Sequence, residues 1–218
     1  MTADSIDVIL PCLDEAEALP WVLGRMPSWA RVIVADNGST DGSPSIARSL
    51  GATVVDVRAR GYGSACHAGL EAATSDVVAF MDADASLDPR QLALLRTHLV
   101  DEVHLVIGCR VPVSRAAWPW HLRMANREVS RRLRRRTGFR LADLGPMRLA
   151  WRVPLLALQI EDRRSGYPLE TVVRAVESGW QVASVEVDYH PRAGRSKVTG
   201  TPLGALRAVT DMSRILAS

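Results

Sequence analysis

The chain has 218 residues, of which 47% are apolar and 23% charged, and it carries a formal net charge of +3. A chain of this length and composition buries a sizeable core, which excludes a disordered or fibrous protein. No stretch approaches the roughly 18 consecutive apolar residues of a membrane-spanning helix, and the N-terminus lacks the pattern of a secretion signal. We therefore expect a cytoplasmic protein that is at most peripheral to a membrane.

Strand-like runs alternate with helical patterns through the first half of the chain. The predicted strands cover residues 6–11, 31–36, 53–57, 76–82 and 103–109. The predicted helices cover residues 20–26, 43–50, 63–73 and 89–99. This alternation predicts an α/β fold, in which a doubly wound, mainly parallel sheet carries helices on both faces.

The pattern changes after Arg110, without any linker that would separate a second domain. The elements expected there are a basic helix over 121–136, a loop over 141–148, a helix over 168–178, a strand over 180–190 and a glycine-containing segment over 191–200. We expect one domain over residues 1–218, with residues 1–110 and 111–218 as its two halves.

The cysteines and histidines indicate neither disulfides nor a zinc site. Cys12, Cys66 and Cys109 are far apart and lie among apolar or small residues. The five histidines include no pair three to five residues apart. We expect reduced thiols in the core.

Acidic residues follow two of the predicted strands. Asp36, Asn37 and Asp41 come after the second strand, and Asp82 and Asp84 come after the fourth. Ligands of open parallel sheets bind beyond the carboxyl ends of the strands, so both clusters are expected on one rim. A tight turn explains Asp41 and its neighbours, but not why Asp36 ends an apolar strand.

Asp82 and Asp84 point to the same side of an extended segment, because successive side chains alternate. Mg²⁺ prefers oxygen ligands and commonly takes one or two carboxylates, with water and substrate phosphates in its other positions. The alternative is that these aspartates only cap the helix that begins at Pro89. Asp88 suits that capping role better, which leaves the pair for a metal.

Four motifs in order, "VILPCLDEAEALP", "VIVADNGSTDGS", "RGYGSACHAG" and "FMDADASLDP", resemble those of the family 2 glycosyltransferases, which have the GT-A fold and use nucleotide-activated sugars. The resemblance implies Mg²⁺ or Mn²⁺ on Asp82 and Asp84. The nucleotide-binding residues that we predict are Pro11, Leu13, Glu15, Asp36, Asn37, Gly61, Gly63 and Asp82. Leu13 stands where the family often has an aromatic residue, and Ser86 where dolichyl-phosphate mannose synthases tend to have glutamine.

The segment with Gly61 and Gly63 lacks the spacing of a dinucleotide-binding fingerprint. Its glycines permit a turn into a helix N-terminus, a place that favours anions such as phosphate. A plain strand-to-helix turn explains the same glycines.

Three looser motifs in the second half resemble the dolichyl-phosphate or polyprenyl-phosphate sugar synthases of that family: "GFRLADLGPMR", "GYPLE" and "VDYHPRAGRSKVTG". They suggest a polyprenyl phosphate as acceptor. The candidate acceptor-binding residues are Arg127, Arg131, Arg192, Ser196 and Lys197, since arginine, lysine and hydroxyl groups suit phosphate.

Residues 121–140 contain eight arginines and one glutamate. Leu122, Ala125, Val129 and Leu133 recur there at near-helical spacing, which predicts a basic amphipathic helix suited to an anionic membrane surface. A solvated charged face is the alternative. Nucleic acid is disfavoured, because residues 121–136 contain no Phe, Tyr or Trp for stacking and no recognised nucleic-acid motif accompanies them. Membrane contact could also come from the C-terminal helix or a separate membrane protein.

These features together predict a metal-dependent, inverting transfer of a hexose from a nucleotide sugar to a polyprenyl phosphate. A phosphate acceptor is already anionic and needs little help from a base. Asp143 is a candidate catalytic residue, and either Asp143 or Glu170 would be the base for a hydroxyl acceptor; otherwise they orient arginines or the sugar, or form salt bridges.

Three other functions remain open. A family 2 transferase could use a soluble hydroxyl acceptor, and a sugar-nucleotide-binding subunit could share the fold without catalysing transfer. A nucleotidyltransferase is disfavoured, because the turn after the first strand is acidic rather than glycine-rich and basic.

Overall fold

The computed structural model describes residues 5–194 and 202–217. Its centre is a seven-stranded sheet with the order β3-β2-β1-β4-β6-β5-β7. The strands are β1 (Ile6–Cys12), β2 (Ala30–Asp36), β3 (Thr53–Asp56), β4 (Val77–Phe80), β5 (Val103–Pro112), β6 (Arg148–Trp151) and β7 (Gln181–Tyr189). Strands from both halves of the chain therefore belong to one sheet.

The sheet is mainly parallel, as predicted. β1 pairs in parallel with β2 and β4, so that Ile9 lies between Ile33 and Phe80. β5 and β7 are also parallel, whereas β6 runs antiparallel to both of its neighbours. The sequence did not predict β6, whose first residue, Arg148, was assigned to a loop. Nor did it predict the short helix α6 (Arg152–Ala157) that follows β6.

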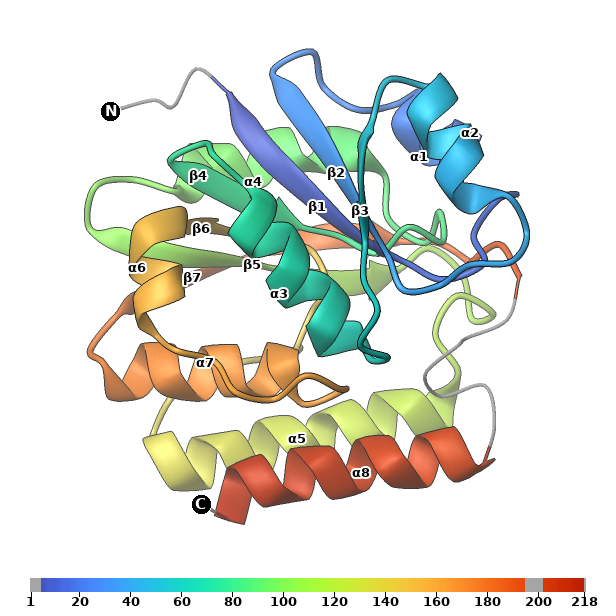
Figure 1. Cartoon of the computed structure of the whole chain (residues 1–218). Helices are drawn as coiled ribbons and strands as arrows, with labels where there is room; N and C mark the ends of the chain where they lie inside the picture. The colour runs from blue at the N-terminus through green and yellow to red at the C-terminus, as the bar shows by residue number, and fades with distance from the viewer. Residues whose placement is uncertain (1–4, 195–201, 218) are drawn as a thin grey trace.

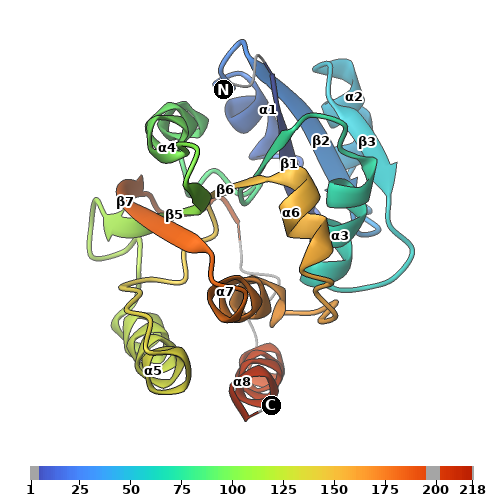
Figure 2. The same ribbon diagram turned by 90° about the vertical axis from the view of Figure 1, so that its left-hand side faces the viewer.

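Helices cover both faces of the sheet (Figures 1 and 2). One face carries α1 (Leu19–Leu23), α2 (Ser43–Ser49) and α4 (Leu92–His98), the last preceded by a 3₁₀ turn over Pro89–Gln91. The other carries α3 (Tyr62–Ala72), α6 and α7 (Tyr167–Glu177). Each face buries its own apolar cluster, with Leu10 and Leu92 in one and Ile9 and Leu70 in the other.

Two long helices lie side by side at one end of the molecule, α5 (Trp120–Thr137) and α8 (Pro202–Ala217) (Figures 1 and 2). Arg136 of α5 joins three helices, because its guanidinium pairs with Glu177 of α7 at 2.8 Å and donates to the Ile215 carbonyl of α8. Among the described residues, no helix is long and apolar enough to cross a membrane.

Asp7 of β1 is a fully buried carboxylate that ties the sheet to the turn before β4. It accepts hydrogen bonds from Arg31 Nε at 2.8 Å and from the Thr74 and Ser75 amides at 2.7 and 2.8 Å. Burial alone would raise the pKa of Asp7, but these hydrogen bonds outweigh it and hold the pKa below its ordinary value.

Replacing Asp7 with asparagine is expected to lower the free energy of unfolding by about 2 kcal/mol at neutral pH, since charge-assisted bonds are lost. Because the pKa of Asp7 is lower in the folded than in the unfolded chain, its ionised carboxylate stabilises the folded state at pH values above the unfolded-state pKa. This stabilisation is lost as the pH falls through the folded-state pKa. The difference from wild type should therefore shrink below about pH 4 in urea titrations. Exposed Asp76→Asn is the matched control, and a pH-independent difference would contradict this account.

Candidate active site

A cavity of about 1250 Å³ opens at the carboxyl ends of β1 and β4. Asp82 and Asp84 line it, together with Asn37 from the end of β2, so the structure brings the two acidic clusters to one rim as expected. Arg110 of β5 and Arg192, which follows β7, line the same cavity. Its far wall comes from α5, α8 and the loop before α5, and it is mostly apolar. The polar members of that wall are Asn126, Glu128, Arg132 and Ser213.

The two aspartates have few protein partners. The Tyr62 hydroxyl donates to Asp82 Oδ1 at 3.2 Å, and the Ser86 amide donates to Asp84 Oδ1 at 3.0 Å. Burial and the nearby charge of Asp84 raise the pKa of Asp82 above its ordinary value. Capping is left to Asp88, which accepts from the Arg90 amide at 3.0 Å as predicted. Neither carboxylate serves as the helix cap, so the pair is a candidate site for a cation, for which Arg192 competes at Asp84.

Asp84 already forms an ion pair with a side chain of the protein: Arg192 Nη2 lies 3.2 Å from Asp84 Oδ2. No group of three or more His, Cys, Asp or Glu residues suited to a metal occurs in residues 5–194 and 202–217. Two carboxylates without a third ligand fit Mg²⁺ or Mn²⁺, whose other positions go to water and substrate phosphates. They do not fit a structural zinc ion, which needs four protein ligands.

Arg192 and a metal ion compete for Asp84. We expect Arg192→Gln to bind Mn²⁺ about fivefold more tightly than wild type in the absence of nucleotide, since a partly exposed ion pair contributes about 1 kcal/mol. Arg192→Lys, which keeps the charge, should stay close to wild type. Titration of free Mn²⁺ followed by electron paramagnetic resonance measures this, and weaker binding by Arg192→Gln would contradict it.

Five of the predicted nucleotide-binding residues, besides Asp82, line the cavity: Pro11, Leu13, Glu15, Asn37 and Gly61. Asp36 does not. Its Oδ2 accepts from the Gly38 and Ser39 amides, both at 3.1 Å, while its buried Oδ1 has no hydrogen-bond partner in the described part of the chain. The side chain of Asn37 holds the next segment, because it donates to the Ala59 carbonyl and accepts from the Gly61 amide.

At the N-terminus of α3 the Gly61, Gly63 and Ser64 amides already donate to protein acceptors, so these three amides are not free for the phosphate expected there. The Gly63 and Ser64 amides donate to the Arg164 and Arg163 carbonyls at 2.9 and 2.8 Å. A Cβ on Gly63 would lie 2.7 Å from the Arg163 carbonyl carbon, and one on Gly61 would lie 2.2 Å from its oxygen. These glycines therefore allow the segment before α7 to pack against α3, and Gly63 does not line the cavity.

Asp143 is a positioning residue for Arg110, which the sequence did not single out. The guanidinium of Arg110 donates to both carboxylate oxygens of Asp143, at 2.8 and 2.7 Å, and lies 4.2 Å from the centre of the Trp118 ring. Asp143 is buried and absent from the cavity lining, whereas Arg110 lines it. Both carboxylate oxygens bind Arg110, which favours a positioning role, and the catalytic role of Asp143 stays a prediction. The only feature of the sequence that could have indicated Arg110 is its position directly after the strand predicted over residues 103–109.

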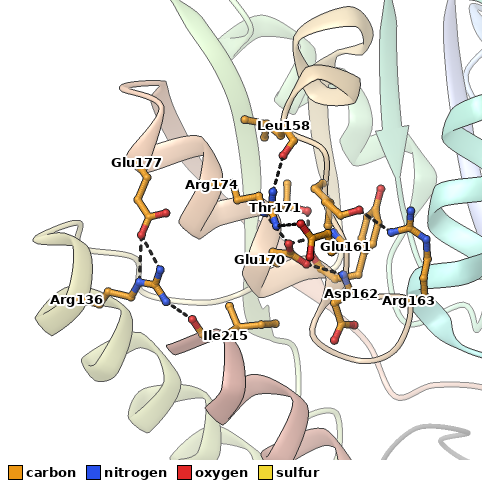
Figure 3. Close-up of polar contacts among 12 residues, drawn as sticks. Arg136, Leu158, Glu161, Asp162, Arg163, Glu170, Thr171, Arg174, Glu177 and Ile215 are labelled. Carbon is orange, nitrogen blue, oxygen red and sulfur yellow. Dashed lines mark hydrogen bonds and ion pairs between the residues drawn. The ribbon is translucent and has the colours of Figure 1, made fainter. Parts of the chain in front are cut away.

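Glu170 is held by neighbouring polar groups (Figure 3), and it does not line the cavity. Its carboxylate accepts from the Glu161 and Asp162 amides at 3.0 and 2.6 Å and pairs with Arg174 at 2.6 Å. It thereby fixes the segment that packs on α3. The candidate base Glu170 is a structural carboxylate.

The predicted acceptor-binding residues separate into three groups. Arg192 lines the cavity. Arg127 and Arg131 are exposed on α5 and do not line it, and Arg131 pairs with Glu128 at 2.7 Å. Ser196 and Lys197 lie outside the described residues.

The apolar stripe of α5 faces inward rather than outward. Leu133 is buried, and Leu122 and Val129 are half-buried against the two core clusters. Leu122, Ala125 and Val129 also line the cavity. This stripe is therefore not the membrane-contacting surface that its periodicity suggested.

Solved structures with this arrangement define the class of fold. Glucosyl-3-phosphoglycerate synthase from Mycobacterium tuberculosis, crystallised with phosphoglyceric acid, superposes with a TM-score of 0.75 at 23% identity, over 98% of this chain and 80% of that chain. The same enzyme with Mn²⁺, uridine diphosphate and glucosyl-3-phosphoglycerate gives a TM-score of 0.72 at 21% identity, over the same shares of both chains. The fold is that of the GT-A glycosyltransferases.

The chain belongs to the family "Glycosyl transferase family 2", which it matches over residues 7–153, and it is a glycosyltransferase. "Uncharacterized glycosyltransferase Rv0539" of Mycobacterium tuberculosis is 45% identical over the full length of both chains. "Undecaprenyl-phosphate mannosyltransferase" of Micrococcus luteus is 30% identical over 94% of this chain and 91% of its own. "Dolichyl-phosphate hexose transferase" of Haloferax volcanii is 28% identical over 90% of this chain and 88% of its own.

Proposed function

We propose that the protein transfers a hexose from a nucleotide sugar to a polyprenyl phosphate with inversion at the anomeric carbon. An oxygen of the acceptor phosphate attacks the anomeric carbon, and the bond from that carbon to the nucleoside diphosphate breaks. Residues 1–110 bind the donor and residues 111–218 bind most of the acceptor. The relatives that act on undecaprenyl phosphate and dolichyl phosphate support this proposal.

A divalent cation is part of the proposal. Asp82 and Asp84 would hold Mg²⁺ or Mn²⁺, the ions present in crystals of the fold neighbours together with uridine diphosphate. The ion would neutralise charge on the departing diphosphate. Pro11, Leu13, Glu15 and Asn37 lie along the same cavity and would contact the nucleoside.

The main support for a lipid acceptor is that one continuous cavity contains both the aspartates and an apolar wall. One cavity joins Asp82 and Asp84 to an apolar wall. Members of that wall are Trp118, Leu122, Ala125, Val129, Met212 and Leu216. Arg192 lies 3.2 Å from Asp84, and Arg110 lies 4.2 Å from the centre of the Trp118 ring in the wall, so each arginine adjoins one of these regions. Their guanidinium groups suit a phosphate monoester. A prenyl phosphate matches this order of charge and apolar surface.

A soluble phosphate acceptor is the second candidate. It is favoured by the fold neighbours that bind phosphoglyceric acid, and Arg110 and Arg192 would serve such a phosphate equally well. The apolar wall distinguishes the two candidates, because a small polar acceptor has no use for it.

Replacing Ala125 with glutamate tests the use of that wall. Ala125 is exposed and lines the cavity, so the change places a charge there without disturbing the core. We expect KM for a long-chain prenyl phosphate to rise at least about tenfold, since burying apolar chain beside an unpaired carboxylate is unfavourable. KM for the nucleotide sugar should not change. Ala125→Ser is the control, and an unchanged KM for the long-chain acceptor would favour the soluble one.

A further inference from the structure

The outer face of α5 combines exposed apolar and basic side chains. Trp120 and Met124 at the start of the helix are 72% and 58% exposed, unusually high for large apolar residues. Arg127 and Arg131 follow at spacings of three and four residues, so all four side chains lie on one face. Exposed arginines flank them, namely Arg123, Arg134 and Arg135. These seven residues are called the outer face of α5.

The inner stripe of the same helix is already used. Leu122, Val129 and Leu133 pack against the core clusters, and the side chains of Leu122 and Val129 reach the cavity. The outer face lies on the opposite side of the helix, at the end of the molecule that α5 and α8 form (Figures 1 and 2). It is therefore directed away from the sheet.

We infer that the outer face of α5 docks the enzyme on an anionic lipid surface. Five arginines on this face supply attraction to acidic headgroups, and the single acidic residue of the helix, Glu128, is already paired with Arg131 and Arg132. Tryptophan and methionine at one end of the face enter the interfacial region of a bilayer, where an indole ring is favoured. Electrostatic attraction to nucleic acid would require the arginines but not the exposed tryptophan and methionine.

This inference rests on the proposed function, because docking on a membrane serves the enzyme only if its acceptor is a lipid. It adds to that proposal the surface of the protein that would face the membrane. The apolar wall of the cavity lies on the inner side of α5, with the docking face on the outer side of the same helix. A prenyl phosphate anchored in the bilayer would then reach the cavity past one helix.

Co-sedimentation with lipid vesicles tests the docking without using the reaction. Wild type should bind vesicles of phosphatidylcholine mixed with phosphatidylglycerol and not vesicles of phosphatidylcholine alone. Arg123→Glu/Arg134→Glu should weaken binding more than about tenfold, because each arginine near an anionic surface contributes several-fold to partitioning. Trp120→Ala/Met124→Ala should weaken it at least about fivefold.

Matched controls test whether the effect depends on where the substitutions lie and not only on the change in charge or apolar surface. Arg48→Glu/Arg58→Glu makes the same charge change at exposed residues of another part of the molecule, and Leu94→Ala/Val153→Ala removes exposed apolar side chains elsewhere. Both should bind vesicles like wild type. Vesicle binding that survives the changes on the outer face, or an arginine-dependent binding to RNA without binding to vesicles, would overturn the inference.

Transfer to a short, water-soluble prenyl phosphate distinguishes this inference from the proposed function. Arg123→Glu/Arg134→Glu should keep that transfer, since neither residue lines the cavity. Vesicle binding without any transfer would refute the proposed reaction and leave the docking face standing. Transfer without vesicle binding would refute the docking face alone.

Discussion

Asp84→Asn is expected to lower the rate of sugar transfer at least about a hundredfold. If Asp84 is a metal ligand, as we propose, the change weakens binding of the metal and leaves the charge of the diphosphate unbalanced. Asp84 is 5% exposed and shares the cavity with Asp82. The change should also weaken Mn²⁺ binding in a titration, which a purely structural role would leave untouched. Initial rates across a range of Mn²⁺ concentrations measure both effects.

Asp88→Asn is the matched control, since Asp88 lies four residues further along the same loop and caps the 3₁₀ turn. Asparagine caps a helix about as well as aspartate, so stability and transfer should both stay near wild type. Equal losses in the two variants would mean that Asp84 only maintains the loop. Full activity of the Asp84→Asn variant would refute the proposed metal site.

Asp143→Asn is expected to lower the free energy of unfolding by about 3 kcal/mol, because Arg110 loses its partner in a mostly buried site. It should also raise KM for the phosphate acceptor at least about tenfold, since Arg110 is no longer held over the cavity. Hydrolysis of the donor in the absence of acceptor should persist. Urea titration and steady-state kinetics at one pH provide the two values.

Glu170→Gln provides the comparison for Asp143. It also breaks a buried carboxylate's ion pair, with Arg174, but its side chain lies away from the cavity. It should lose stability while retaining the wild-type KM for acceptor. If Asp143→Asn instead kept acceptor binding and lost turnover together with one limb of the pH–rate profile, Asp143 would be the general base after all.

The α/β fold and its mainly parallel sheet were predictable, because each parallel strand appears as an apolar run followed by helical spacing. β6 was not. It has four residues and begins with Arg148, a buried arginine whose guanidinium donates to the Gly145 and Pro168 carbonyls at 2.8 and 2.6 Å. A charged residue whose partners are backbone carbonyls gives no strand pattern in the sequence.

The candidate site was predictable where one segment carries it and not where distant segments meet. Asp82 and Asp84 are adjacent to a strand end, so the topology alone placed them on the rim. The partnership of Arg110 with Asp143 spans 33 residues and left no local pattern. For α5, the periodicity predicted an apolar stripe, but only the packing of Leu122, Val129 and Leu133 showed that this stripe faces the protein.

The most direct measurement is the transfer of radiolabel from GDP-mannose, UDP-glucose or UDP-N-acetylglucosamine to polyprenyl phosphate, read as label in the organic-solvent phase. We predict that label enters that phase with one of these donors, only when both lipid phosphate and Mg²⁺ or Mn²⁺ are present, and not with Asp84→Asn. Donor turnover that places label on a water-soluble phosphate acceptor, with none in the organic phase, would contradict the lipid acceptor.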